Sequence, residues 1–74
     1  MIRINYSYLD RFKKTKGYYT YTVINGVYLI FDENTLDYVG VDVVFTPNNY
    51  NRLNYKCEEK LVDLISKGLV EYYE

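Results

Sequence analysis

Apolar and polar side chains alternate along the first part of the chain. Over residues 2–9 isoleucine and tyrosine alternate with polar residues, which is the pattern of a half-buried β-strand. The same alternation covers 18–24 and 27–31, and Asn25-Gly26 between them is a strong signal for a two-residue hairpin turn. We therefore predict three strands over these ranges, with the polar stretch 10–17 forming a loop.

The hydrophobic pattern also selects a register for a fourth strand. If Asp32 pairs with Leu36 across a three-residue loop, the face that holds Leu29 and Phe31 also receives Asp37, Val39, Val41, Val43 and Phe45. A slip of one residue would send those valines to the other face, and burial fixes register in this way. The sheet is then predicted to have an aliphatic face and a tyrosine-rich face. The predicted tyrosine-rich face carries Tyr19, Tyr21, Val23, Tyr28, Ile30, Leu36, Tyr38 and Asp42.

The C-terminal third carries the stripe of an amphipathic helix. Its apolar positions recur at intervals of three and four residues: Tyr50, Leu53, Cys57, Leu61, Leu64 and Ile65. Thr46-Pro47 suits the start of the helix, asparagines weaken 48–54, and 55–67 forms the firm part before a left-handed stop at Gly68. We predict one α+β domain over residues 1–74. It has an antiparallel four-stranded sheet, one C-terminal helix packed on one face, and a short fifth strand in the tail 69–74.

Composition agrees with a small strand-rich domain. The 74 residues are 49% hydrophobic and include 11 tyrosines, which favours strands, and the net charge of −1 is too small for a disordered chain. The single Cys57 cannot form an internal disulfide, which favours a reducing environment. The apolar runs are too short for a signal peptide or a membrane span. We therefore expect a soluble protein of the cytoplasm, with no membrane partner.

Charge is distributed unevenly along the chain. Residues 1–31 hold five basic side chains and one acidic one, a net of +4, whereas residues 32–74 hold four basic and nine acidic ones, a net of −5. The basic side chains cluster in one loop, at Arg11, Lys13, Lys14 and Lys16. The candidate acidic surface is formed by Asp37, Asp42, Glu58 and Glu59. The two regions are candidate contact surfaces for partners of opposite charge.

The chain contains no pattern typical of an enzyme. It has no histidine, one cysteine cannot build a cysteine–histidine metal site, and the four glycines are too scattered to cradle a phosphate. Four carboxylates, Asp32, Glu33, Asp37 and Asp42, could hold Mg²⁺, but turn chemistry and a solvated strand end are the simpler interpretation of these positions. A tyrosine nucleophile would need an activating partner, and Cys57 falls on the apolar helix stripe. We predict no catalytic residue, no metal and no cofactor.

In composition the chain resembles small phage-encoded accessory proteins of the anti-defence class, which includes anti-CRISPR proteins. It is short, free of histidine and rich in Tyr, Asn and Lys, as in "NNYNRLNYK". The resemblance implies a non-enzymatic protein that inhibits a host defence enzyme by occupying its surface, in the cytoplasm of the host cell. An acidic patch, from Asp32 to Asp42 or along Glu58, Glu59 and Asp63, could mimic nucleic acid in that contact.

Two other uses of the tyrosine-rich face remain open. Four tyrosines on one sheet face suit a homodimer interface, because a small domain gains missing core by self-association. The same tyrosines, with the basic loop at 11–16, could instead stack and hold single-stranded or distorted DNA. The order of strands followed by a helix is similar to the transcriptional coactivator family of single-strand binders, which dimerise and bind through sheet and loop. The net charge of −1 argues against that alternative.

Overall fold

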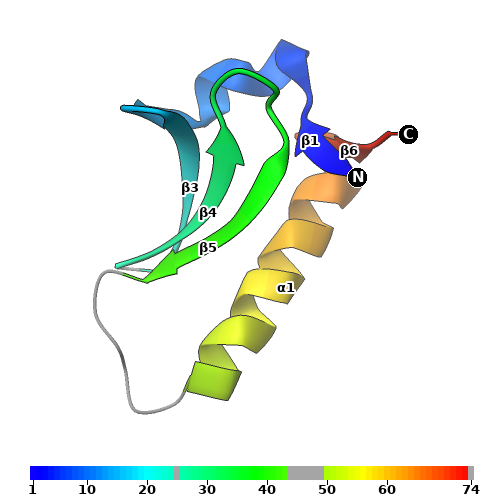
Figure 1. Cartoon of the computed structure of the whole chain (residues 1–74). Coiled ribbons are helices and arrows are strands. Elements are labelled where there is room, and N and C mark those ends of the chain that lie inside the picture. The colour runs from blue at the N-terminus through cyan, green and yellow to red at the C-terminus, as the bar shows by residue number, and fades with distance from the viewer. Residues whose placement is uncertain (25, 44–49, 74) are drawn as a thin grey trace.

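A four-stranded antiparallel sheet with a single helix along one face forms the main part of the molecule (Figure 1). The computed structural model describes residues 1–24, 26–43 and 50–73, and for residues 50–54 it describes the helical backbone alone. In chain order the elements are β1 (Ile2–Ile4), the 3-10 helix η1 (Tyr6–Arg11), β2 (Lys13–Thr15), β3 (Tyr18–Ile24), β4 (Val27–Asp32), β5 (Tyr38–Val43), α1 (Tyr50–Ser66) and β6 (Val70–Tyr72). The predicted α+β fold is confirmed.

The strands group differently from the prediction. The four-stranded sheet has the order β2-β3-β4-β5, and β1 pairs with β6 in a separate two-stranded sheet. The predicted first strand at 2–9 is therefore wrong beyond Ile4, and β2 arises inside the stretch predicted as a loop. The predicted tail strand exists as β6, but its partner is β1.

Asn5 ends the first strand by capping a helical turn. Its side-chain carbonyl accepts a hydrogen bond from the Ser7 backbone N–H at 3.1 Å, and its amide donates to the Gly68 carbonyl at 3.0 Å. Asparagine competes with strand pairing in this way, because its side chain satisfies nearby backbone groups. As a result Tyr6 leaves the alternating pattern and is 78% exposed.

A β-bulge interrupts the pairing of β3 with β4. Ile24 lies opposite Val27, as the sequence predicts, but one extra residue is inserted between Thr22 and Ile24. From there on the register differs by one residue, so Tyr21 lies opposite Leu29. Directly opposed residues share a face of the sheet. The bulge therefore moves Tyr19 and Tyr21 onto the face of Leu29.

The turn between β4 and β5 also differs from the predicted three-residue loop. The Asp32 carboxylate accepts hydrogen bonds from the backbone N–H groups of Asn34 and Thr35, at 2.7 and 3.0 Å. Leu36 adopts a left-handed conformation with φ of 68°, so Asp37 takes the pairing position opposite Asp32. This shift of one residue places Tyr38 opposite Phe31.

A second irregularity, between Ile30 and Phe31, partly restores the predicted arrangement. It brings Val41 opposite Leu29 and Val43 opposite Val27, so both valines lie on the predicted face. Val39 lies at the irregularity and is 59% exposed. Because β5 is an edge strand, Val41 is also exposed in part.

The two-stranded sheet closes one end of the molecule and brings the two ends of the chain together (Figure 1). The N-terminal ammonium donates to the Tyr73 carbonyl at 2.9 Å. The Ile4 N–H donates to the Leu36 carbonyl at 2.9 Å, which ties β1 to the β4–β5 turn. Arg3 also pairs with Glu71 at 3.3 Å.

Helix α1 covers the face of the sheet that carries Leu29 and Phe31, and the core lies between them (Figure 1). The helix ends where the sequence predicts, because Gly68 has φ of 82° and the N–H of Leu69 donates back to the Leu64 carbonyl at 2.9 Å. The predicted start at Thr46-Pro47 lies outside the described residues. The buried apolar side chains of the described part are Ile4, Phe12, Val27, Leu29, Phe31, Cys57, Leu64, Leu69 and Val70.

Candidate functional site

The four predicted contact tyrosines do not share a face of the sheet. Tyr19, Tyr21 and Tyr38 lie on the helix side and pack against the core. Of the four, Tyr28 alone lies on the face of the sheet turned away from α1, called here the open face, where it is opposite Asp42. The prediction of a tyrosine-rich face is therefore wrong, because the bulge in β3 and the left-handed residue at the β4–β5 turn each shift the register by one. A dimer or nucleic-acid site built on that face loses its basis.

Two of the tyrosines on the helix side, Tyr21 and Tyr38, stabilise the fold through aromatic contacts. The ring of Tyr21 lies 5.5 Å from that of Phe12, and the ring of Tyr38 lies 5.4 Å from that of Phe31, measured between centroids. Burial raises the pKa of the Tyr38 hydroxyl, and the neighbouring Cys57 and Glu58 raise it further. Tyr38 is therefore a neutral core residue at ordinary pH.

Cys57 is buried on the inner side of α1, where the helical stripe places it. Burial raises the pKa of its thiol, which keeps the sulfur protonated. A protonated, covered thiol is a poor nucleophile. Cys57 therefore acts as a small apolar side chain of the core.

The basic loop residues lie around the outer edge of the sheet. Lys13 and Lys14 are in β2, where successive side chains point to opposite faces, and Arg11 and Lys16 flank this strand. All four are exposed. Lys14 lies opposite Tyr19, with its ammonium 6.0 Å from the centre of the tyrosine ring. The structure thus brings one predicted basic residue together with one predicted tyrosine.

These two residues line an open hollow beside η1, called here the η1 hollow. Its volume is about 460 Å³, and its lining residues are Tyr6, Ser7, Leu9, Asp10, Phe12, Lys14 and Tyr19. It is a mainly apolar and aromatic surface with one ammonium and one carboxylate. The sequence did not reveal it because Tyr6 was assigned to a strand. The available signal was Asn5 followed two residues later by Ser7, an Asx-type cap.

The predicted acidic residues are divided between separate surfaces. Asp37 is half-buried and accepts a hydrogen bond from the Tyr73 hydroxyl, so it serves the fold. Asp42 is exposed on the open face of β5. Glu58 and Glu59 are exposed on α1. The four carboxylates therefore do not form one acidic patch, and only the pair on α1 is adjacent.

The glutamate pair lies beside two exposed apolar side chains, and we call these four residues the α1 outer face. Tyr55 and Val62 are 62% and 64% exposed, and with Glu58 and Glu59 they line a shallow hollow of about 460 Å³. The neighbouring Glu59 carboxylate raises the pKa of Tyr55. The sequence reasoning missed Tyr55 and Val62. Their spacing of seven residues, off the core stripe, was the signal.

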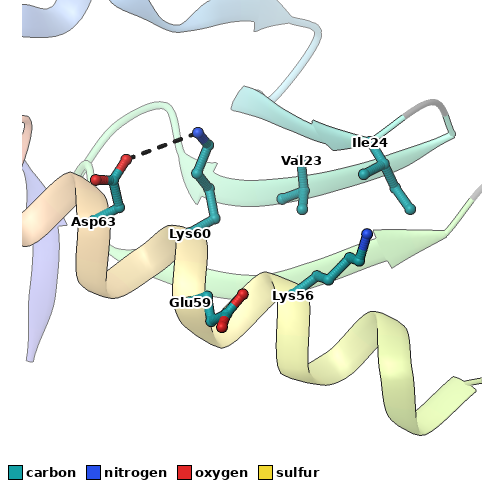
Figure 2. Close-up of a pocket in the computed structure, with 6 residues that line it drawn as sticks. All are labelled: Val23, Ile24, Lys56, Glu59, Lys60 and Asp63. Carbon is teal, nitrogen blue, oxygen red and sulfur yellow. Dashed lines mark ion pairs between the residues drawn. The ribbon is translucent and has the colours of Figure 1, made fainter.

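A third hollow lies between α1 and the end of β3 (Figure 2). It measures about 350 Å³ and is lined by Val23, Ile24, Lys56, Glu59, Lys60 and Asp63. In Figure 2 Lys60 points toward Asp63, with 3.8 Å between ammonium and carboxylate, and Lys56 extends toward the end of β3. Two positive and two negative side chains offset each other here. This third hollow therefore favours neither a positively nor a negatively charged ligand.

In the part of the chain that the structure describes, no three cysteine or carboxylate side chains come together as metal ligands would. No helix within residues 1–24, 26–43 and 50–73 is both long and apolar enough to cross a membrane.

Comparison of the chain with protein-family models, with curated proteins and with solved structures found no match. The residues and their geometry therefore carry the functional inference.

Proposed function

We propose that this chain is a small non-enzymatic binding protein that inhibits an enzyme by covering part of its surface with the α1 outer face. The observation behind the proposal is the exposure of Tyr55 and Val62 on one helix face beside Glu58 and Glu59. The compositional resemblance to anti-defence proteins suggests a host defence enzyme as the target. That role places the protein in the cytoplasm of the host cell.

Exposed apolar surface of this kind supports a contact role. A chain of 74 residues has few large apolar side chains to spare, because it buries only about 60% of its unfolded surface. Two of them nevertheless lie on the solvent side of α1. Tyrosine is enriched at interfaces because it offers a large contact area with a polar tip. Tyr55 is thus the proposed anchor of the contact.

The charge of the α1 outer face indicates the kind of partner. Glu58 and Glu59 are both exposed, so their carboxylates suit a partner surface rich in lysine or arginine. Enzymes that act on nucleic acids carry such basic surfaces along their substrate grooves. A nuclease of a host defence system would therefore present a surface complementary in charge to the α1 outer face. Binding there would exclude the nucleic acid.

The direct test is binding to, and inhibition of, candidate host nucleases that carry a basic groove. The double variant Glu58→Lys/Glu59→Lys reverses two charges in the proposed contact. A matched control, Glu33→Lys/Asp42→Lys, reverses two carboxylates that lie off α1 and outside the η1 hollow. We expect the α1 variant to lose affinity by about tenfold or more and to lose inhibition, while the control stays close to the unmodified protein.

Tyr55→Ala extends the test to the apolar part of the face. This side chain is largely exposed, so its removal should leave the fold intact while weakening capture and inhibition. Equal affinity for all variants would contradict the proposal. Self-association that disappears in Glu58→Lys/Glu59→Lys, measured by light scattering, would reassign the surface to contacts between copies of this chain.

A further inference from the structure

We propose that the η1 hollow binds an unstacked base of a single-stranded nucleic acid, with the phosphates running past the lysines of β2. This inference goes beyond the proposed function and does not depend on it, because it uses a different surface. It also replaces the predicted tyrosine-rich face with a site on the other side of the sheet.

The shape and lining of the hollow suit a flat aromatic ligand. Its volume of about 460 Å³ lies within the range of small-ligand sites, roughly 300 to 1,000 Å³. Tyr6 and Tyr19 come from different elements, η1 and β3, and both contribute to its wall. Tyr6 is 78% exposed, so a large part of its ring is free to contact a base. Aromatic rings stack on bases with little dependence on sequence.

The floor of the hollow is packed against the core. Phe12 is buried and lies 5.3 Å from Phe31 in an edge-to-face arrangement, and Leu9 packs against the same core. The Phe12 N–H donates to the Leu9 carbonyl at 3.1 Å, which fixes the end of η1 against β2. A base would therefore enter a preformed apolar surface and displace only solvent.

Charges around the hollow distinguish a nucleic acid from a neutral aromatic ligand. The segment 10–16 carries four positive side chains and one negative one, and all five are exposed. Lys14 lies at the hollow itself, and Lys13 projects from the opposite face of the same edge strand. A phosphate backbone can follow such an edge while its base turns inward. Asp10, in the hollow wall, offers an acceptor to an N–H group of a base, such as the ring N3–H of thymine or uracil.

The negative charge of the rest of the chain limits the expected affinity for a nucleic acid. Residues 32–74 carry a net charge of −5, so binding should be weak and strongly dependent on salt. For single strands the logarithm of affinity falls by about 0.7 per phosphate contact for each tenfold rise in salt. One phosphate contact from each of Lys13, Lys14 and Lys16 predicts a slope of about −2 for the logarithm of affinity against the logarithm of salt concentration.

The experiment is fluorescence anisotropy of labelled oligothymidylate and oligouridylate with the full chain at low salt. Tyr6→Ala should weaken binding by about fivefold or more, since one stacking contact is lost. The matched control Tyr72→Ala removes another tyrosine that is 70% exposed, on β6, and should bind as the unmodified chain does. Lys14→Ala should lower both affinity and salt slope, whereas Lys56→Ala on α1 should change neither by a comparable amount.

Three results would overturn the inference. They are no binding to either oligonucleotide at low salt, equal affinity of Tyr6→Ala and Tyr72→Ala, and duplex DNA binding as tightly as the single strand. The last follows because a duplex offers no free base to the hollow. The Glu58→Lys/Glu59→Lys variant should retain oligonucleotide binding, so failure of this site and failure of the α1 outer face are distinguishable.

Discussion

Replacing Phe12 by alanine removes the side chain that joins the basic edge of the sheet to the core. Phe12 is only 6% exposed, and its ring contacts those of Tyr21 at 5.5 Å and Phe31 at 5.3 Å. The sequence alone places this residue in a polar loop. Its contribution to stability therefore measures directly whether η1 and β2 fold as the structure has them.

The expected loss is large compared with the total stability. Truncation of a buried phenylalanine to alanine costs about 3 to 5 kcal/mol. A chain of 74 residues is stable by roughly 4 to 11 kcal/mol, at about 0.05 to 0.15 kcal/mol per residue. Phe12→Leu keeps most of the apolar volume and loses two aromatic contacts, worth about 1 to 3 kcal/mol together. The predicted order of stability is thus unmodified chain, Phe12→Leu, Phe12→Ala.

Urea unfolding followed by circular dichroism measures these differences. Thermal unfolding should agree, because each kcal/mol shifts the midpoint by about 4 to 8 °C in a domain of this size. Tyr6→Ala is the control from the same segment, and its exposed ring predicts a change within about 0.5 kcal/mol. If Phe12→Ala destabilised the protein by less than about 1 kcal/mol, residues 10–17 would form a loop that does not contact the core, and the pairing of β2 with β3 would be contradicted.

Three further predictions follow from local contacts. The pKa of Asp32 in the folded protein lies below its ordinary value of 3.8 because the backbone N–H groups of Thr35 and Asn34 donate to its carboxylate. The ionised carboxylate therefore stabilises the fold fully at pH values above 3.8, and this contribution is lost as the pH falls through the lowered pKa of the folded state. Urea midpoints of Asp32→Ala and the unmodified chain should therefore differ at neutral pH and converge in acid; a constant gap would contradict this. Gly68→Ala should destabilise the protein by about 1 to 2 kcal/mol in the same assay, because φ there is +82°, and Gly68→Asn should cost less; equal costs would contradict the left-handed turn. The Cys57 thiol should react with a thiol reagent slowly in the native protein and fully in denaturant; rapid native reaction would show that it is not buried.

The helix and its end were predictable because their signals are local. The intervals of three and four residues define the inner stripe, and Gly68 supplies the left-handed residue that closes the last turn. Neither depends on which strand the helix meets. The fold class followed from the same signals together with the alternating stretches.

The sheet register was not predictable because a bulge breaks the alternation of side chains at one point, and nothing in the sequence pattern locates that point: Tyr21 and Ile24 lie on the same face although they are three residues apart. The extra residue between Thr22 and Ile24 shifts the pairing by one, yet no glycine or proline marks that point. Tyrosine adds to the ambiguity, since its ring suits the core and its hydroxyl suits solvent. Tyr21 therefore fits either face by composition, and only the packing around Phe12 decides.

The candidate sites were partly visible in the sequence. Glu58, Glu59 and Lys14 were identified as charged surface residues, and the structure leaves all three exposed. Their apolar neighbours Tyr55 and Tyr6 were not. Exposure of an aromatic side chain depends on which elements pack over it, and the sequence pattern does not report that.

The most direct measurement of the central claim, that Tyr19 and Tyr21 of β3 lie on the helix side of the sheet, is the set of nuclear Overhauser contacts from the Tyr21 ring. The structure predicts contacts with the ring of Phe12 and with the methyl groups of Leu29, which lies opposite Tyr21. Contacts with the methyl groups of Ile30 and none with Phe12 would restore the tyrosine-rich face and contradict the arrangement described above.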